Sequence, residues 1–107
     1  GVGRYSDIYA SIITQRVMRE RGLHVHFGQP FIWQQRNKHN LIGDLRQEID
    51  GMEHVRHLAG ILEDIRFFAD ENPVRTIYKH LGGRVSWWPK QASEAALAFL
   101  DDMESVL

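Results

Sequence analysis

Apolar residues recur at steps of three and four along residues 41–68, and this spacing constrains the fold more than any other feature of the chain. They are Leu41, Leu45, Ile49, Met52, Val55, Ala59, Leu62 and Ile65. An α-helix has 3.6 residues per turn, so these side chains share one helical face. The pattern predicts one long helix, or two helices that break near Gly51 or Gly60, since glycine weakens a helix interior.

Three further segments are expected to be helical: residues 6–21, residues 73–81 and the residues from about 93 onward. In each segment, apolar side chains recur at helical spacing. Residues that commonly begin or end helices flank these segments. They are Ser6, Asp7, Gly22, Pro73, Gly82, Gly83, Ser93 and Glu94.

A short extended region separates the first two helical segments. Residues 23–27 read Leu-His-Val-His-Phe, and this period-two alternation is typical of a half-buried strand. Residues 31–33 form a second apolar run, which is extended because Pro30 restricts its neighbours. Asn40, at the end of a polar loop, can cap the long helix. The sequence thus predicts a mainly α fold, a small helical domain with one short β-hairpin or extended pair.

Length and composition exclude several classes of protein. The 107 residues suit one domain of ordinary size, and zero cysteines exclude a disulfide framework or a thiolate metal site. A net charge of −1 supplies no global field for nucleic acid or an anionic membrane. No apolar run approaches the roughly 18–20 residues of a membrane span. We expect a cytoplasmic location, since no signal-peptide pattern opens the chain. Because the chain starts Gly-Val-Gly, we also expect it to be a processed or excised piece of a longer protein.

Asp7 is the first candidate for chemistry. The first-turn amides of a helix hold a carboxylate well, and an ionised carboxylate can take a proton from a sugar hydroxyl. The structural alternative is that Asp7 or Ser6 caps the helix and Arg4 pairs with the carboxylate. Spacing alone favours the cap.

Two histidine pairs are spaced so that both members lie on one side of their element. His24 and His26 would share a face of a strand, and His54 and His57 a face of a helix. Each pair could chelate a divalent ion, but each lacks a third ligand at the right spacing. We therefore expect polar, solvated faces and no metal bound by this chain alone.

Aromatic and basic residues gather in two places. Arg36 and Lys38 follow Trp33, and together they could hold a phosphate and stack on a ring, or form a solvated loop in which Trp33 is a core anchor. Trp87 and Trp88 are expected in the core, with a sugar-stacking or docking surface as the alternative. Because the chain has no continuous basic stripe, we expect no nucleic-acid partner.

Several short segments stand in a recognisable order in the first half of the chain. Residues 5–9 read Tyr-Ser-Asp-Ile-Tyr, Gln15 and Arg16 follow, and residues 30–34 read Pro-Phe-Ile-Trp-Gln. The first and last resemble Tyr-Asp-Asp-Met-Trp and Pro-Tyr-Ile-Trp-His segments of the plant reversibly glycosylated polypeptides, which are UDP-arabinopyranose mutases. The helix resembles the STELLO glycosyltransferases, which have Asp-Ile-Trp followed by Gln-Arg. The resemblance covers roughly residues 3–50.

This resemblance implies the C-terminal part of a nucleotide-sugar enzyme of the GT-A type. It assigns the catalytic base or acceptor-binding carboxylate to Asp7, and substrate positioning to Arg4 and Tyr5. Trp33 and Arg36 would border the sugar diphosphate. The intact enzyme would bind a nucleotide-sugar donor, a sugar acceptor and a divalent ion, Mn or Mg, with nucleotide and metal held by an N-terminal catalytic half.

The chain departs from these families at specific positions. Ser6 replaces the first Asp of the mutase pair, and Gln34 replaces the His, so Gln34 cannot bind metal or diphosphate as that His would. The chain also shows neither alternating strand–helix units nor the Asp-any-Asp motif with which GT-A enzymes bind metal. It should therefore have no transferase activity alone.

Two interpretations remain open. In the first, residues 1–107 form a single domain, with an acceptor-side glycosyltransferase segment at 1–50 and a helical appendage at 51–107. In the second, the chain is a non-catalytic helical interaction module. That module would present the apolar face of residues 45–52, or the tryptophan pair, to a partner.

Overall fold

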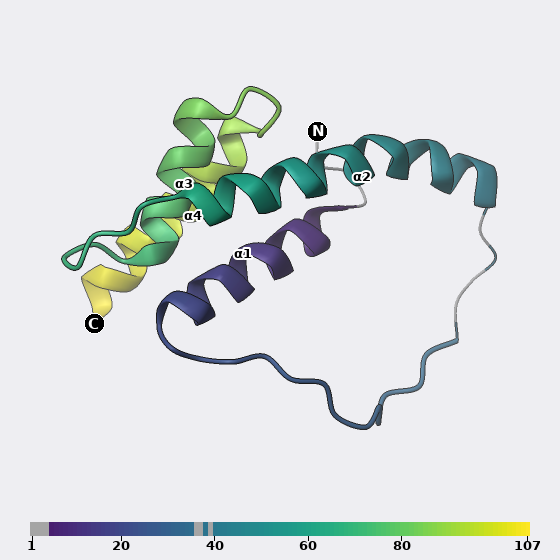
Figure 1. Cartoon of the computed structure of the whole chain (residues 1–107), viewed down its shortest axis with the longest axis horizontal. Helices are drawn as coiled ribbons and strands as arrows, with labels where there is room; N and C mark the ends of the chain where they lie inside the picture. The colour runs from purple at the N-terminus through teal and green to yellow at the C-terminus, as the bar shows by residue number, and fades with distance from the viewer. Residues whose placement is uncertain (1–4, 36–37, 39) are drawn as a thin grey trace.

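Four helices make up most of the chain in the computed structural model, which describes residues 5–35, 38 and 40–107 (Figure 1). They are α1 (Ser6–Glu20), α2 (Leu41–Asp64), α3 (Pro73–Arg84) and α4 (Lys90–Val106). The expectation of a mainly α fold is confirmed. None of the helices in these ranges is both long and apolar enough to cross a membrane.

The expected β-hairpin does not form within the described ranges. Residues 23–35 run as an extended segment without strand pairing. This segment and the first turns of α2 project away from the packed part of the fold (Figure 1). An isolated two-stranded hairpin is marginal in water unless a third strand or a helix covers its apolar face. Here Phe27 and Phe31 are more than nine-tenths exposed, so no such cover exists.

Helix α1 ends as the sequence predicts but begins differently. Gly22 adopts a left-handed φ of 73°, and the amide of Leu23 donates to the Met18 carbonyl at 2.8 Å, which closes the helix as a Schellman motif. At the start, Tyr5 occupies the N-cap position and no side chain makes a capping hydrogen bond. The predicted cap at Ser6 or Asp7 is therefore wrong, because both residues already lie in the first helical turn.

Helix α2 is one continuous helix. The Asn40 side chain caps it by accepting a hydrogen bond from the Gly43 amide at 3.1 Å, as predicted. The helix passes through Gly51 and Gly60 without a break and ends at Asp64. Inside the helix, Gly51 leaves room for the ring of Tyr5 at the start of α1.

Helices α3 and α4 form a tightly packed pair. Pro73 starts α3, as predicted, behind the Asn72 side chain, which accepts from the Val74 amide at 2.9 Å. Helix α3 runs through Gly82, where a Cβ atom would lie 2.8 Å from Ser93 Cβ of α4. The glycine thus permits close helix contact and does not end the helix. Ser93 in turn lies inside α4, which begins at Lys90 and not near residue 93.

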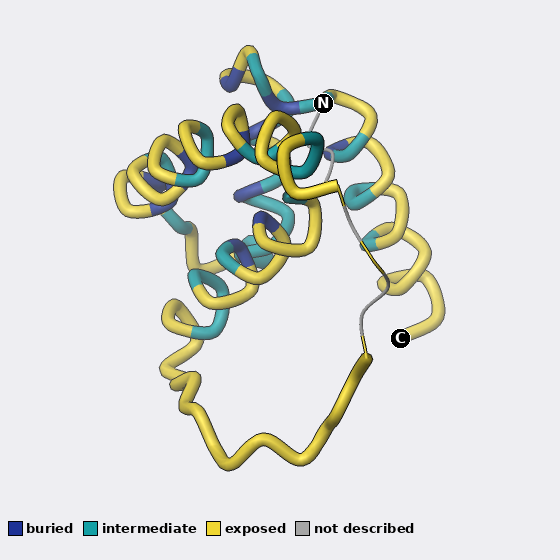
Figure 2. Tube along the Cα trace, turned by 90° about the vertical axis from the view of Figure 1, so that its right-hand side faces the viewer, coloured by how far each residue is buried: buried dark blue, intermediate teal, exposed yellow. Residues whose placement is uncertain are grey.

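The core lies between the C-terminal half of α2, α3 and the connection from α3 to α4, with α1 packed across it (Figure 2). Its buried apolar residues are Tyr9, Ile13, Leu58, Leu62, Ile65, Ile77, Leu81, Val85 and Trp88. The radius of gyration is 16.0 Å, against about 13 Å for a compact domain of this length. The excess reflects the extended segment of residues 23–35 and the projecting start of α2 (Figure 1).

Candidate functional site

Asp7 lies at the exposed start of a helix that is firmly anchored on its other side. Its carboxylate accepts a hydrogen bond from the Ile8 amide at 2.9 Å. Two residues further on, Tyr9 is 1% exposed and packs in the core together with Ile13. The core therefore fixes the axis of α1, while the Asp7 carboxylate stays open to solvent at the positive end of the helix dipole.

Tyr5 is a packing residue in this fold. Its ring lies against Gly51 of α2, where a Cβ atom would come within 2.6 Å of the Tyr5 Cε2 atom. The same ring stands 5.8 Å from the ring of Tyr9. Glycine at position 51 thus allows the start of α1 to approach α2 closely. This contact also positions the first turn of α1, which carries Asp7.

The other residues proposed to bind substrate do not join Asp7 in the described structure. Arg4 and Arg36 lie outside the described residues. Trp33 is 84% exposed, so it is not the core anchor of the structural alternative. Its segment leaves from the C-terminal end of α1, which lies about 20 Å along the helix from Asp7. Asp7 and the segment that carries Trp33 therefore attach to opposite ends of α1.

A groove runs between α1, α2 and the start of the extended segment. It encloses about 290 Å³, with Ile12 and Leu62 among its apolar lining residues. An ion pair between Arg19 and Glu63, 2.6 Å long, lines it too. The guanidinium of Arg19 lowers the pKa of the Glu63 carboxyl through a hydrogen bond and its charge. These two charges satisfy each other, and the side chains of Arg16 and His24 also line the groove.

The two histidines of α2, His54 and His57, pack against Trp87 of the same chain. The ring of His54 stacks on Trp87 with centroids 4.3 Å apart and an angle of 4° between the planes. The Trp87 Nε1 group donates a hydrogen bond to His57 Nδ1 at 2.7 Å. His24 and His26 are both exposed on the extended segment. Across the described ranges, no three His, Asp or Glu side chains gather closely enough to hold a metal ion.

The tryptophan pair lies where a core interpretation places it. Trp88 is 6% exposed, and its Nε1 donates to the buried Ser93 hydroxyl at 2.9 Å. Trp87 is half-buried, 6.0 Å from the Trp88 ring. The prediction of a core position is thus confirmed for Trp88, whereas Trp87 lies at the edge of the core with His54 stacked on its ring.

Two arginines have structural roles that the sequence pattern did not indicate. Arg16 of α1 is half-buried: its Nε donates to the Leu62 carbonyl at 2.9 Å, and its guanidinium lies 4.5 Å from the Phe67 ring centre. Helix periodicity detects an apolar face but not an arginine that reaches a carbonyl on another helix.

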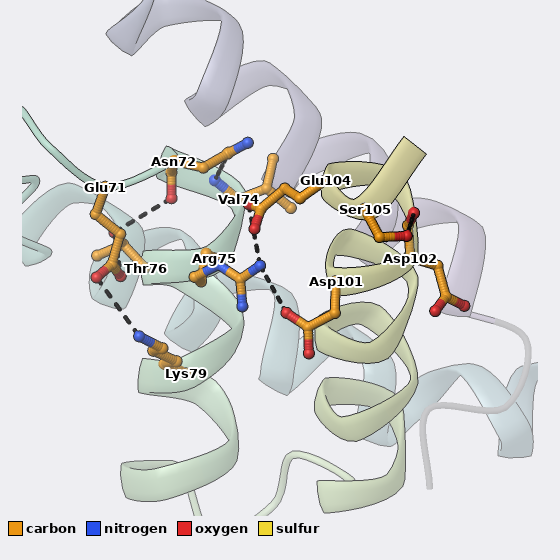
Figure 3. Close-up of polar contacts among 10 residues, drawn as sticks. All are labelled: Glu71, Asn72, Val74, Arg75, Thr76, Lys79, Asp101, Asp102, Glu104 and Ser105. Carbon is orange, nitrogen blue, oxygen red and sulfur yellow. Dashed lines mark hydrogen bonds and ion pairs between the residues drawn. The ribbon is translucent and has the colours of Figure 1, made fainter. Parts of the chain in front are cut away.

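Arg75 joins α3 to the last turns of α4. Its guanidinium is paired with Asp101 at 2.9 Å and Glu104 at 3.1 Å (Figure 3). Hydrogen bonds to the two carboxylates raise the pKa of Arg75. The carboxylates are more than half exposed, whereas the arginine is 17% exposed. The cluster joins the two helices through one guanidinium that two carboxylates share.

Comparison of the chain with family models, characterised proteins and solved structures finds no match.

Proposed function

We propose that this chain is the acceptor-side, C-terminal part of a cytoplasmic, nucleotide-sugar-dependent glycosyltransferase, inactive without an N-terminal catalytic half. The observation that carries the proposal is the setting of Asp7, an exposed carboxylate in the first turn of a helix whose opposite face is buried. A catalytic base needs this combination of a fixed backbone and an open side chain. The order of the segments at residues 5–9, 15–16 and 30–34, which resembles two glycosyltransferase families, supports the same role.

In this proposal, Asp7 accepts the proton of an acceptor hydroxyl. The hydroxyl oxygen forms a bond to the anomeric carbon of the donor sugar, and the bond from that carbon to the nucleoside diphosphate breaks. Arg4 and Tyr5 would position the acceptor, and Trp33 and Arg36 would border the sugar diphosphate. Tyr5 serves mainly through its packing on α2, which sets the position of the first helical turn.

The divalent Mn or Mg ion is proposed for the intact enzyme and not for this chain. The described residues bring together no set of three oxygen or imidazole ligands, so we assign no ligand here. The nucleotide and the metal would both be held by the N-terminal half.

The decisive experiment measures nucleoside diphosphate release by the full-length protein with a panel of nucleotide sugars and acceptors. Asp7→Asn should lower kcat by about 10²–10⁴-fold, the usual contribution of a general base. An asparagine oxygen can still accept from the Ile8 amide, so the free energy of unfolding should fall by no more than about 1 kcal/mol, the cost of losing the charge at the helix start. Asp102→Asn, the same change on the exposed face of α4, is the matched control. Turnover that survives Asp7→Asn contradicts the role of Asp7.

A second experiment separates donor binding from chemistry. Because Trp33 is exposed and contributes little to this core, Trp33→Ala should leave the thermal stability of the isolated chain unchanged. In the full-length protein it should raise KM for the donor more than it lowers kcat. Phe31→Ala, an equally exposed aromatic change in the same segment, is the control. Equal effects of the two substitutions on KM would show that Trp33 has no particular role in donor binding.

The alternative is a non-catalytic interaction module, and one specific observation favours it. The N-terminal half of α2 carries apolar side chains that are about half or more exposed: Leu41, Ile42, Leu45, Ile49 and Met52. Soluble monomers rarely expose a contiguous apolar surface of this kind. The tryptophan pair, in contrast, is packed and does not offer a docking surface. A full-length protein that binds a partner through α2 and turns over no nucleotide sugar would favour this alternative.

A further inference from the structure

The groove between α1, α2 and the extended segment is lined by apolar side chains from all three elements. Ile12 comes from α1, Leu62 from α2, and Leu23 and Val25 from the extended segment. Leu23 and Val25 are about half exposed, so part of the apolar lining is in contact with water. The groove volume of about 290 Å³ is close to the roughly 300 Å³ at which pockets for small organic ligands begin. The groove is therefore large enough for a small molecule with an apolar body.

One lining residue of the groove, Arg16, is held from three sides by the fold. Its Nε donates to the Leu62 carbonyl at 2.9 Å, and its Nη1 pairs with Glu20 at 3.3 Å. Its guanidinium also lies 4.5 Å from the centre of the Phe67 ring. The Arg16 side chain is only 13% exposed. Because these contacts already fix the guanidinium, it would lose little conformational freedom on binding an anion.

These contacts leave some of the donor groups of Arg16 unused. A guanidinium has five N–H donors, and the hydrogen bonds above involve only Nε and Nη1. Among the described residues, the Nη2 group has no hydrogen bond or ion pair. Protein atoms do not enclose it completely, so a ligand can reach it. A planar guanidinium with an open edge is suited to a carboxylate, because it can donate to both carboxylate oxygens.

A second guanidinium at the groove, that of Arg19, is paired only with an exposed carboxylate. Its ion pair with Glu63 is 2.6 Å long, but the two side chains are 56% and 63% exposed. Ion pairs this exposed are weak, so another carboxylate can replace Glu63. The pKa of Glu63 is lowered by its hydrogen bond to Arg19, by the charge of Arg19 and, to a smaller extent, by the charge of Arg16. Both guanidiniums thus act at the same place, where they outnumber the single carboxylate of the described lining.

We propose that this groove binds a small monocarboxylate with an unbranched apolar chain. Arg16 and Arg19 would hold the carboxylate of the ligand. The chain of the ligand would cover the exposed parts of Leu23 and Val25. This site is separate from Asp7, since Arg16 lies nine residues, or about 14 Å, further along α1. Ligand binding here therefore does not depend on the proposed transferase activity, and it can be measured on this chain alone.

Titration of the chain with butanoate, hexanoate and octanoate, followed by amide NMR chemical shifts, tests the proposal. Affinity should rise by up to about fourfold for each added methylene, the usual gain from burying one CH₂ group. The amides of Leu23 and Val25 should shift, whereas those of α4, which does not line the groove, should not. 1-Hexanol has a similar chain without the charge and should bind at least about 10-fold more weakly than hexanoate. Equal binding of these two compounds, or no saturable binding of octanoate, overturns the proposal.

Two substitutions at the groove should change the affinity for hexanoate in opposite directions. Arg19→Gln removes one of the two guanidiniums and should weaken binding by about 10-fold. Glu63→Gln removes the competing carboxylate and should strengthen binding by up to about fivefold, the most that an exposed ion pair usually contributes. Arg56→Gln, at an exposed arginine of α2 outside the groove, is the control and should have no effect.

The opposite signs distinguish binding at this groove from unspecific attraction to a basic surface. Weaker or unchanged binding by Glu63→Gln contradicts the proposal, and so does an equal loss in Arg19→Gln and Arg56→Gln. Arg16 is kept in all three variants, because its contact with Phe67 makes it part of the fold.

Discussion

The Nε1 group of Trp87 donates a hydrogen bond to Nδ1 of His57 at 2.7 Å, while the His54 ring lies parallel to the same indole. The two histidines are one helical turn apart on α2, so they hold the indole between a stacking contact and a polar one. Because Nδ1 is the acceptor, the proton of the neutral His57 ring resides on Nε2. This arrangement fastens the connection between α3 and α4 to α2.

A double-mutant cycle on Trp87 and His57 should measure this bond. Trp87→Phe keeps an aromatic ring but removes the donor, and we expect a loss of about 0.5–1.5 kcal/mol in the free energy of unfolding. In a His57→Ala background the same substitution should cost less, because the acceptor is already gone. Urea denaturation gives all four values. His26→Ala, a change at an exposed histidine, is the control and should have almost no effect. Additive losses would show that the two side chains do not interact in solution.

Two adjacent glycines in α3 should respond oppositely to alanine. At Gly82 a new Cβ would lie 2.8 Å from Ser93 Cβ, so Gly82→Ala should force α3 and α4 apart and cost about 1–3 kcal/mol. At Gly83 nothing lies within 4 Å, so Gly83→Ala should gain up to about 1 kcal/mol from helix propensity. Thermal or urea unfolding of the two variants checks the sign. A gain from Gly82→Ala would mean that the helix contact is looser than the structure shows.

The sequence predicted helix α2 and its apolar face because helical spacing depends only on local geometry. The same spacing could not distinguish Leu45 from Leu62, which both belong to the predicted stripe but are 50% and 2% exposed. What covers each part of the stripe is decided by helices distant in the sequence. The contact of Trp87 with His57 was missed for the same reason, since 30 residues separate the two.

For the candidate site, too, the sequence predicted local structure but not the contacts between distant residues. Local signals placed Asp7 at the start of a helix, and the structure puts it in the first turn. The alternation in residues 23–27 predicted a strand, but a strand needs a neighbour, and the described residues offer none. Nothing in the spacing around Gly51 indicated that Tyr5 would pack against it.

Leucine-to-alanine changes along α2 should separate the two parts of its apolar stripe. Leu62→Ala removes a fully buried side chain of this stripe from the core and should cost about 2–5 kcal/mol. Leu45→Ala removes a half-exposed side chain beyond the core and should cost less than about 1 kcal/mol in the isolated chain. Urea denaturation of the isolated chain compares them directly. A large loss from Leu45→Ala in dilute isolated chain would indicate that the start of α2 is covered there, for example by self-association.

Alkaline pH should destabilise the fold through Tyr9, which is buried, and Tyr78, which is half-buried. Burial raises the pKa of Tyr9, with smaller contributions from Tyr5 and Asp50, and burial also raises the pKa of Tyr78. Above the ordinary tyrosine value of about 10, the unfolded chain therefore loses phenolic protons that the folded chain keeps. The unfolded state then binds fewer protons, so the free energy of unfolding falls as the pH rises beyond about 10.

The substitution Tyr78→Phe isolates one of these contributions, because lysines titrate in the same range. At neutral pH the variant should be nearly as stable as the parent, since the phenyl ring fills the same space. Between about pH 9 and 11 it should lose less stability than the parent, because one ionising phenol has been removed. Urea denaturation across this range, with tyrosinate absorbance followed in parallel, provides the comparison. Identical losses for the two proteins would show that the Tyr78 hydroxyl titrates alike in the folded and unfolded states.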